Sequence, residues 1–256
     1  MSSPRKEGLL DHLLELRRRL LRCFFAVLAV FLVLMPFAQR LYTLVAAPLL
    51  ERLPEGATMI ATQVTTPFLT PFKLTFFAAL FVAMPFVLYQ AWAFVAPGLY
   101  QQEKRLFAPL FVTSVLLFYA GVAFAFFIVF PLIYGFLVMM APEGVAIMTD
   151  IGEYLDFVLT LFFAFGVAFE VPVATVLLVW AGFTTPGALA EKRQYVLLGC
   201  FVIGMFLTPP DVISQTLLAV PMYLLYEVGI IMSRVFLKGW KEVEAQRAAM
   251  ARQRDR

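Results

Sequence analysis

The sequence has little of what most catalytic and metal sites are built from. Its 256 residues include one histidine, His12, and two cysteines, Cys23 and Cys200, which both fall inside apolar runs. A histidine cluster, a CxxC metal site and a disulfide framework are therefore not expected within the chain. The sequence also has no Walker A loop and no GxGxxG, HExxH or GxSxG motif. We expect a protein that is not an enzyme, with no catalytic residues, no metal, no cofactor and no nucleic-acid partner.

Charge is scarce as well. Charged residues make up 14% of the chain and hydrophobic residues 62%, whereas soluble domains are about a quarter charged and about half apolar. This composition excludes an ordinary soluble domain. It predicts an all-α, polytopic membrane protein.

Six apolar runs predict six transmembrane helices, at about 21–38, 74–93, 106–131, 157–180, 194–207 and 212–232. A helix needs roughly 20 apolar residues to cross a hydrocarbon core of ~30 Å. The fifth run has about 14 residues, or roughly 21 Å of helix, so it cannot cross an undistorted bilayer. The first run follows a basic segment without an A-x-A-like cleavage site, which indicates a retained membrane helix rather than a signal peptide.

The placement of basic residues predicts the topology. With six spans and both termini in the cytoplasm, 17 of the 20 Lys and Arg residues lie on the cytoplasmic side, as the positive-inside rule requires. The segment 142–156 is then external, and it has four acids and no base. A split of the third run at Pro131 would reverse everything downstream and break this pattern. We expect one membrane domain at 1–238, followed by a basic cytoplasmic tail at 239–256.

The N-terminal stretch GLLDHLLELRRRLLR is typical of an amphipathic helix at the membrane surface. Glu15 is followed at i+3 and i+4 by Arg18 and Arg19, on the polar face. Arg17 instead points out of the leucine face. Two interpretations of Arg17 stay open: it snorkels to lipid headgroups, or it faces a ligand.

Two acids lie inside predicted spans. Glu170 is near the middle of the fourth span, where an acidic group costs about 2.5–3.5 kcal/mol on insertion scales. It must face protein or water, or be protonated, so a structural hydrogen bond and a hydrated functional cavity are both open. Pro172 also deprives the carbonyl of Ala168 of its helical donor. Glu227, one to two turns before Arg234 in the sixth span, favours a local structural pairing.

The first cytoplasmic loop, FVAPGLYQQEKR (94–105), holds an acid that the positive-inside rule does not need. Glu103 precedes Lys104 and Arg105, and the loop also contains Phe94 and Leu99. A solvated loop with a loose ion pair is one interpretation. Apolar groups beside an acid at a membrane surface also suit a ligand in which arginines precede hydrophobic residues. The second cytoplasmic loop, GALAEKR (187–193), ends in the same three residues and provides an internal control.

Several long motifs in order resemble the TatC family, the polytopic core of the twin-arginine protein translocase. They are HLLELRRRLL (12–21), IATQVTTPFLTPFKL (60–74), FVAPGLYQQEKR (94–105), GVAFEVPVA (166–174) and TPPDVISQTLLAVPMYLLYEVGI (208–230). The resemblance implies six helices in a concave, glove-like bundle with short fifth and sixth helices. It also implies a receptor, in the bacterial cytoplasmic (inner) membrane, that helps export folded proteins with the proton motive force.

The resemblance also implies residue roles. Glu15 and Glu103 would accept the arginine pair of a signal peptide, with Arg17, Phe94, Leu99 and Arg105 completing the site. Glu170 matches the intramembrane acid of the family. The region that meets the single-span subunits TatB and TatA would include Met205, Thr208, Gln215 and Glu227. The expected partners are twin-arginine signal peptides, these subunits, membrane lipid and further copies of the chain.

A second hypothesis from another class is a proton-coupled secondary transporter that uses Glu170 as its proton site. Such a transporter should carry more than one polar group at mid-membrane, together with helices long enough to rock as rigid bodies. Glu170 is nearly alone at that depth and the fifth span is too short. The sequence therefore favours the receptor.

Overall fold

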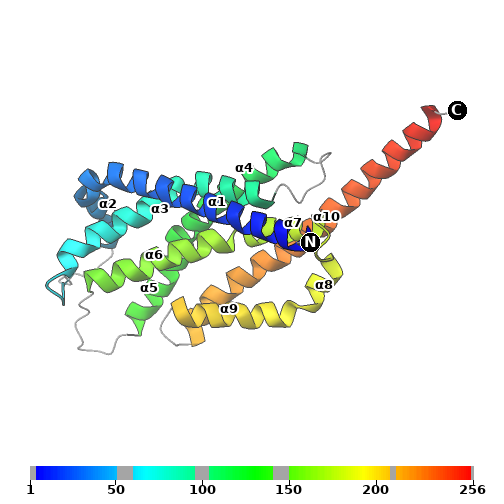
Figure 1. Cartoon of the computed structure of the whole chain (residues 1–256). Helices are drawn as coiled ribbons and strands as arrows, with labels where there is room; N and C mark the ends of the chain where they lie inside the picture. The colour runs from blue at the N-terminus through cyan, green and yellow to red at the C-terminus, as the bar shows by residue number, and fades with distance from the viewer. Residues whose placement is uncertain (1–3, 51–59, 96–103, 141–149, 208–211, 255–256) are drawn as a thin grey trace. The chain divides into compact units, whose positions relative to one another are not determined.

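The computed structural model describes residues 4–50, 60–95, 104–140, 150–207 and 212–254, and these residues are almost entirely helical (Figure 1). The helices are α1 Pro4–Leu34, α2 Ala38–Leu50, α3 Thr66–Val95, α4 Lys104–Phe124, α5 Phe130–Met139, α6 Ile151–Ala168, α7 Val171–Trp180, α8 Pro186–Glu191, α9 Arg193–Leu207 and α10 Val212–Arg254. In this part of the chain, five helical stretches are long and apolar enough to span a membrane, and α9 is a sixth, shorter apolar helix. The predicted all-α, polytopic class is confirmed.

The chain forms two compact units. One contains Met1–Val115 and Tyr134–Leu161, and the other contains Leu116–Ile133 and Phe162–Arg256. The predicted concave, glove-like arrangement concerns the placement of these units and stays a prediction. The division into one membrane domain and a tail also stays a prediction.

In the first unit, α1 packs along α3, and α2 packs on α3 as well. Phe31 of α1 and Phe76 of α3 meet edge to face, with their ring centroids 6.2 Å apart. Small residues, Ala79 and Ala83, are buried along α3 and let the helices approach closely. This packing holds the N-terminal helix against α3, the helix that leads into the segment 94–105.

Prolines interrupt some of these helices and not others. Met35–Phe37, which contains Pro36, is a 3₁₀ turn that separates α1 from α2. Pro71 and Pro85 lie inside α3 without ending it, and the carbonyl of Pro71 accepts a hydrogen bond from the Thr75 hydroxyl at 2.7 Å. Pro131 does not break the third run either, since α4, a π-helical turn and α5 follow one another without a gap. The third run therefore forms one continuous helical stretch and is not divided into two helices at Pro131.

In the second unit, α10 packs against both α7 and α9. Gly229 of α10 allows close contact with α7, because a Cβ atom built there would lie 2.2 Å from the Thr175 hydroxyl oxygen. Gly121 has the same role elsewhere in this unit, since its Cβ would lie 2.4 Å from the Phe165 carbonyl oxygen. Close contact at small residues is the usual way in which membrane helices associate.

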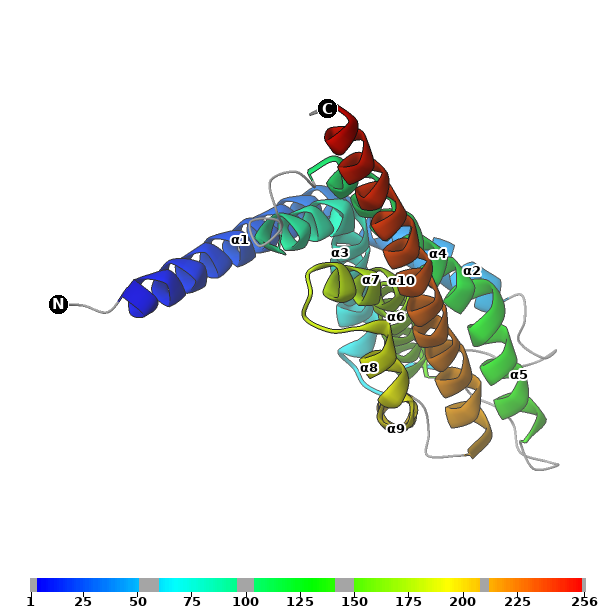
Figure 2. The ribbon, with the colours of Figure 1, turned by 90° about the vertical axis from the view of Figure 1, so that its right-hand side faces the viewer.

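The fifth helix is short, as predicted, but the sixth is not. α9 has 15 residues, or roughly 22 Å of helix, which is less than a hydrocarbon core of ~30 Å. α10 has 43 residues. Its apolar stretch covers Val212–Val235, and the helix then continues to Arg254, beyond the ends of α7, α8 and α9 (Figure 2). No proline lies between span and tail, and the helix continues through Gly239 without a break.

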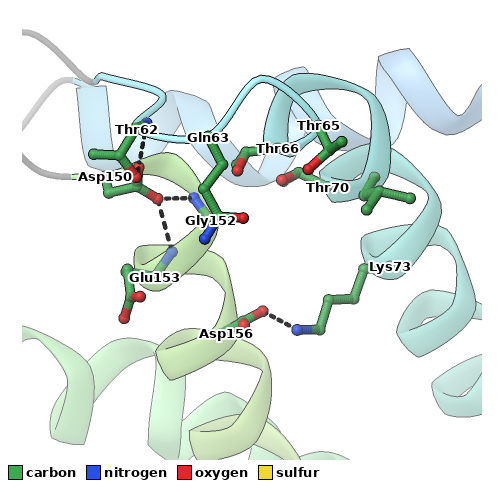
Figure 3. A pocket seen from close by; sticks show the side chains of 11 residues that line it. Thr62, Gln63, Thr65, Thr66, Thr70, Lys73, Asp150, Gly152, Glu153 and Asp156 are labelled. Atoms are coloured by element: carbon green, nitrogen blue, oxygen red, sulfur yellow. Dashed lines mark hydrogen bonds and ion pairs between the residues drawn. The ribbon is translucent and has the colours of Figure 1, made fainter.

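Asp150 organises the start of α6 in the first unit (Figure 3). Its Oδ1 accepts hydrogen bonds from the backbone N–H groups of Gly152, at 2.8 Å, and Glu153, at 3.1 Å, as a helix N-cap does. Its Oδ2 accepts from the backbone N–H and the hydroxyl of Thr62, both at 2.7 Å. Asp150 therefore joins the segment before α3 to the segment before α6. A pocket of about 160 Å³ lies beside it, where Lys73 of α3 pairs with Asp156 of α6.

These hydrogen bonds favour the ionised form of Asp150. The Thr62 hydroxyl has the largest effect, and with the backbone donors it lowers the pKa of Asp150 from its usual 3.8 to about 2. Because the pKa is depressed on folding, the carboxylate stabilises the fold above about pH 4 and loses this effect as the pH falls towards 2.

We expect Asp150→Asn to lower the Tm of the purified protein above about pH 4, because a neutral amide accepts these bonds less strongly. The difference from wild type should shrink as the pH falls towards 2. Thermal unfolding between pH 2 and 7 measures it, with the neighbouring exposed acid changed in Glu153→Gln as the control. A difference that is constant over this range would show that the charge of Asp150 is not the cause.

Candidate functional site

The candidate receptor site begins on α1, where Glu15 is held by an arginine of the same helix. Arg19 donates to Glu15 Oε1 from Nε at 3.0 Å and from Nη2 at 2.6 Å. Arg19 also donates from Nη1 to Oε1 of Gln90 on α3, at 3.3 Å. The predicted pairing of Glu15 with an arginine at i+3 or i+4 is thus confirmed for Arg19. Arg17 is exposed, which fits both interpretations of that residue.

The structure places only part of the predicted recognition loop. Phe94 is half-buried in the last turn of α3, and Arg105 lies in the first turn of α4. Leu99 and Glu103 lie outside the described residues, as does the side chain of Arg105. The structure therefore brings Glu15 to the helix that carries Phe94, and the predicted roles of the loop residues stay predictions.

Gln90 is the residue of this cluster that was not among the predicted site residues. It is only 6% exposed and lies one helical turn before Phe94 on α3, so the two side chains share a face of the helix. A signal was present, since Gln90 is the one amide side chain in the apolar run at 74–93. Its partner could not be read from the sequence because Arg19 is 71 residues away.

Glu227 forms its ion pair with an arginine of another helix. Its two carboxylate oxygens accept from Nε and Nη2 of Arg193 at the start of α9, at 2.6 and 2.7 Å. The Tyr223 hydroxyl donates to Glu227 Oε1 at 2.8 Å. The expected structural pairing is therefore present, but its partner is Arg193 on α9 and not Arg234. This fork fixes the first turn of α9 to α10.

The same hairpin of α9 and α10 carries the other residues predicted to meet a partner subunit. Gln215 of α10 donates from Nε2 to the Phe201 carbonyl of α9 at 2.8 Å, and its side chain covers Gly204. Met205 is 48% exposed on α9. Thr208 lies outside the described residues. Met205 is thus the residue of this group whose side chain is exposed at the surface.

Glu170 lies at a break in the fourth span. α6 ends at Ala168 and α7 begins at Val171, with Pro172 in the first turn of α7. Pro172 has no N–H to continue the helical bonding, so the predicted effect of this proline on the backbone is confirmed. Glu170 occupies the N-cap position of α7 without a side-chain capping bond. The side chain is half-buried and its Oε1 is buried.

A cavity of about 480 Å³ lies in the second unit between α6, α7, α9 and α10. Its lining is almost wholly apolar and includes Val167, Ala168, Val171, Cys200 and Ile203. Ala168 and Val171 flank Glu170 in the sequence. The lining suits an acyl chain or an apolar side chain better than water, so this cavity is not the hydrated cavity that was one of the two interpretations of Glu170.

Comparison with known proteins identifies the family. The family model "Sec-independent protein translocase protein (TatC)" matches residues 11–221. The chain belongs to the TatC family. A curated TatC protein of Azotobacter chroococcum is 66% identical over 222 residues, which cover 87% of each chain. TatC of Escherichia coli K12 is 57% identical over 237 residues, which cover 93% of this chain and 92% of the relative.

Solved structures of TatC agree with this assignment. A crystal structure described as the twin-arginine translocase receptor TatC has a TM-score of 0.80 and 39% identity, covering 88% of this chain and 98% of that chain. A second crystal structure of this receptor, in the detergent DDM, also has a TM-score of 0.80, at 38% identity. The chain is therefore a multi-pass component of a membrane protein translocation system. The secondary-transporter hypothesis has no support in these comparisons.

We expect Glu170→Ala to leave folding and signal-peptide binding largely intact and to impair a later step of transport. The reason is its place at a helix break inside a span, far along the chain from the residues of the N-terminal site. Peptide affinity of the purified variant and export of a reporter protein in cells measure the two effects. If the variant failed to insert while the surviving protein exported normally, Glu170 would be a structural residue.

Proposed function

We propose that this chain is the receptor and core subunit of a twin-arginine translocase, which exports folded proteins across the bacterial cytoplasmic membrane with the proton motive force. The observation that carries this proposal is the likeness to the solved twin-arginine translocase receptor, at 39% identity over 98% of that chain. The described part of the chain offers no group of three or more metal-binding side chains. The proposed role is binding and transport rather than catalysis.

Recognition of the signal peptide would rest on two carboxylates, Glu15 and Glu103. A guanidinium group is planar and can fork onto a carboxylate, with each charge-assisted bond worth about 1.5–3 kcal/mol. Two adjacent arginines on an extended peptide point apart, so two separated carboxylates suit them. Phe94 and Leu99 would contact the hydrophobic residues that follow the arginines. Arg17 and Arg105 would complete the site.

The partner subunits would bind along the α9–α10 hairpin. A single-span helix such as that of TatB or TatA could pack on the exposed side of α9, where Met205 is accessible. Gln215 and Glu227 already bond across the hairpin, so they would shape this surface rather than supply free polar groups. Thr208 completes the proposed contact. We also propose that lipid meets the rest of the apolar surface and that several copies of the chain assemble in the receptor complex.

The proposed topology places both termini in the cytoplasm and the segment 142–156 in the periplasm. Glu153 of this segment is exposed, so we expect a cysteine introduced there to react with a membrane-impermeant thiol reagent in intact spheroplasts. A cysteine at exposed Lys192 in the second cytoplasmic loop is the matched control and should stay unlabelled. The reverse pattern would contradict the topology.

The two loops that end in Glu-Lys-Arg provide the sharpest test of the recognition site. We expect Glu103→Arg to abolish binding of a twin-arginine peptide, because it removes an acceptor and adds repulsion. Glu191→Arg makes the same charge change at the exposed end of α8 and should alter the affinity little. The measurement is the Kd of the peptide for each purified protein at one salt concentration, since exposed charges are screened.

A change in the peptide provides a second test of the recognition site. Replacing its arginine pair with lysines should weaken binding to wild type, because an ammonium group cannot fork onto a carboxylate. Equal losses from Glu103→Arg and Glu191→Arg would mean that bulk charge governs binding, and Glu103 would then have no specific role.

A further inference from the structure

Arg19 connects the two elements of the proposed receptor site. It bonds to Glu15 on its own helix and to Gln90 on α3. Gln90 is almost fully buried and lies one turn before Phe94 on the same face of α3. Arg19 therefore fixes the position of Glu15 relative to the helix that carries Phe94, another residue of the proposed site.

The bonds from Arg19 use only one of the two carboxylate oxygens of Glu15. Both bonds from Arg19 end on Oε1 of Glu15, and a carboxylate offers about four acceptor positions on its two oxygens. The Glu15 side chain is 35% exposed, whereas that of Arg19 is 19% exposed. Arg19 thus uses one oxygen of a carboxylate that is more exposed than the arginine itself, which leaves Oε2 as the oxygen for a second guanidinium.

Holding the carboxylate matters because a free glutamate samples many rotamers. Ordering such a side chain on binding reduces the affinity, and a side chain that is ordered beforehand avoids this cost. An exposed i,i+4 ion pair alone orders a side chain weakly. Here the additional hydrogen bond to buried Gln90 fixes the arginine, which in turn fixes the acid.

We propose that Arg19 is a positioning residue for recognition of the arginine pair: it holds Glu15 by Oε1, with Gln90 as its anchor, and presents Oε2 to a guanidinium of the signal peptide. This inference rests on the proposed function, since it assumes that Glu15 accepts a peptide arginine. Arg19 contributes to specificity because a fixed acceptor direction favours a planar guanidinium over an ammonium.

The test uses the purified full-length protein and two peptides that differ only in an arginine pair or a lysine pair. Arg19→Gln should weaken binding of the arginine peptide about tenfold, the equivalent of roughly one charge-assisted hydrogen bond. It should also reduce the preference for arginine over lysine. Arg18→Gln, which makes the same charge change at the neighbouring exposed position, should change each affinity by less than about twofold.

A second variant distinguishes the loss of this contact from a general loss of folding. Gln90→Leu keeps a similar volume at the buried position and removes only the acceptor for Arg19. This variant should also weaken binding of the arginine peptide, by a smaller factor than Arg19→Gln does. Its Tm should stay close to that of wild type. A double-mutant cycle adds a further check, because Arg19→Gln should have little effect once Glu15→Gln is present.

The outcomes separate this inference from the proposed function. If Glu15→Gln weakens binding of the arginine peptide and Arg19→Gln does not, the proposed receptor site stands and the positioning role of Arg19 is wrong. Tighter binding by Arg19→Gln would make Arg19 a competitor of the ligand, and equal losses for both peptides would make it a general stabiliser; each result overturns the proposal. If neither variant weakens binding, the assignment of Glu15 to the receptor site falls as well.

Discussion

The hydrocarbon interior of a bilayer offers no partners for backbone N–H and C=O groups, and the rest of this structure depends on that constraint. Each apolar stretch must satisfy its backbone internally, and helices do so. In the described helices, the regular backbone hydrogen bonding is interrupted at a few prolines. Pro36 and Pro172 end or begin helices, whereas Pro71 and Pro85 lie within α3. The break near Pro172 places Glu170 at the start of α7, within an apolar stretch long enough to span a membrane.

Ionic side chains gather near the ends of the apolar helices, where water can reach them, and they tie pairs of helices together. Arg19 joins α1 to α3 through Gln90. In the other unit, Arg193 joins α9 to α10 through Glu227. Lys73 and Asp156 join α3 to α6. Exposed ion pairs add little stability on their own. A two-bond fork or a third hydrogen-bond partner, however, restricts the positions that the paired side chains can take. Their main effect is thus on position, which is what a recognition surface requires.

The α9–α10 hairpin shows how a helix that is too short for the membrane can still be held in place. α9 has 15 residues and is anchored near one end by Arg193 and Glu227. Further along, Gln215 donates to a carbonyl of α9, and Gly204 lies against the Gln215 side chain. These contacts leave Met205 on the outer surface of the hairpin. A short, firmly held helix of this kind suits the surface that we propose for the single-span subunits.

The sequence by itself determined the helical class, the number of apolar helices, the shortness of the fifth and the hydrogen bond that Pro172 cannot donate. These features follow from hydrophobic run length and from the missing N–H of proline, which act locally. It also predicted the pairing of Glu15 with an arginine at i+3 or i+4, since this spacing brings side chains together on any helix. Only the tertiary structure showed that Arg19 reaches Gln90 and that Glu227 pairs with Arg193 instead of Arg234. Both depend on which helices pack side by side, and a pattern along one helix carries no record of its neighbour.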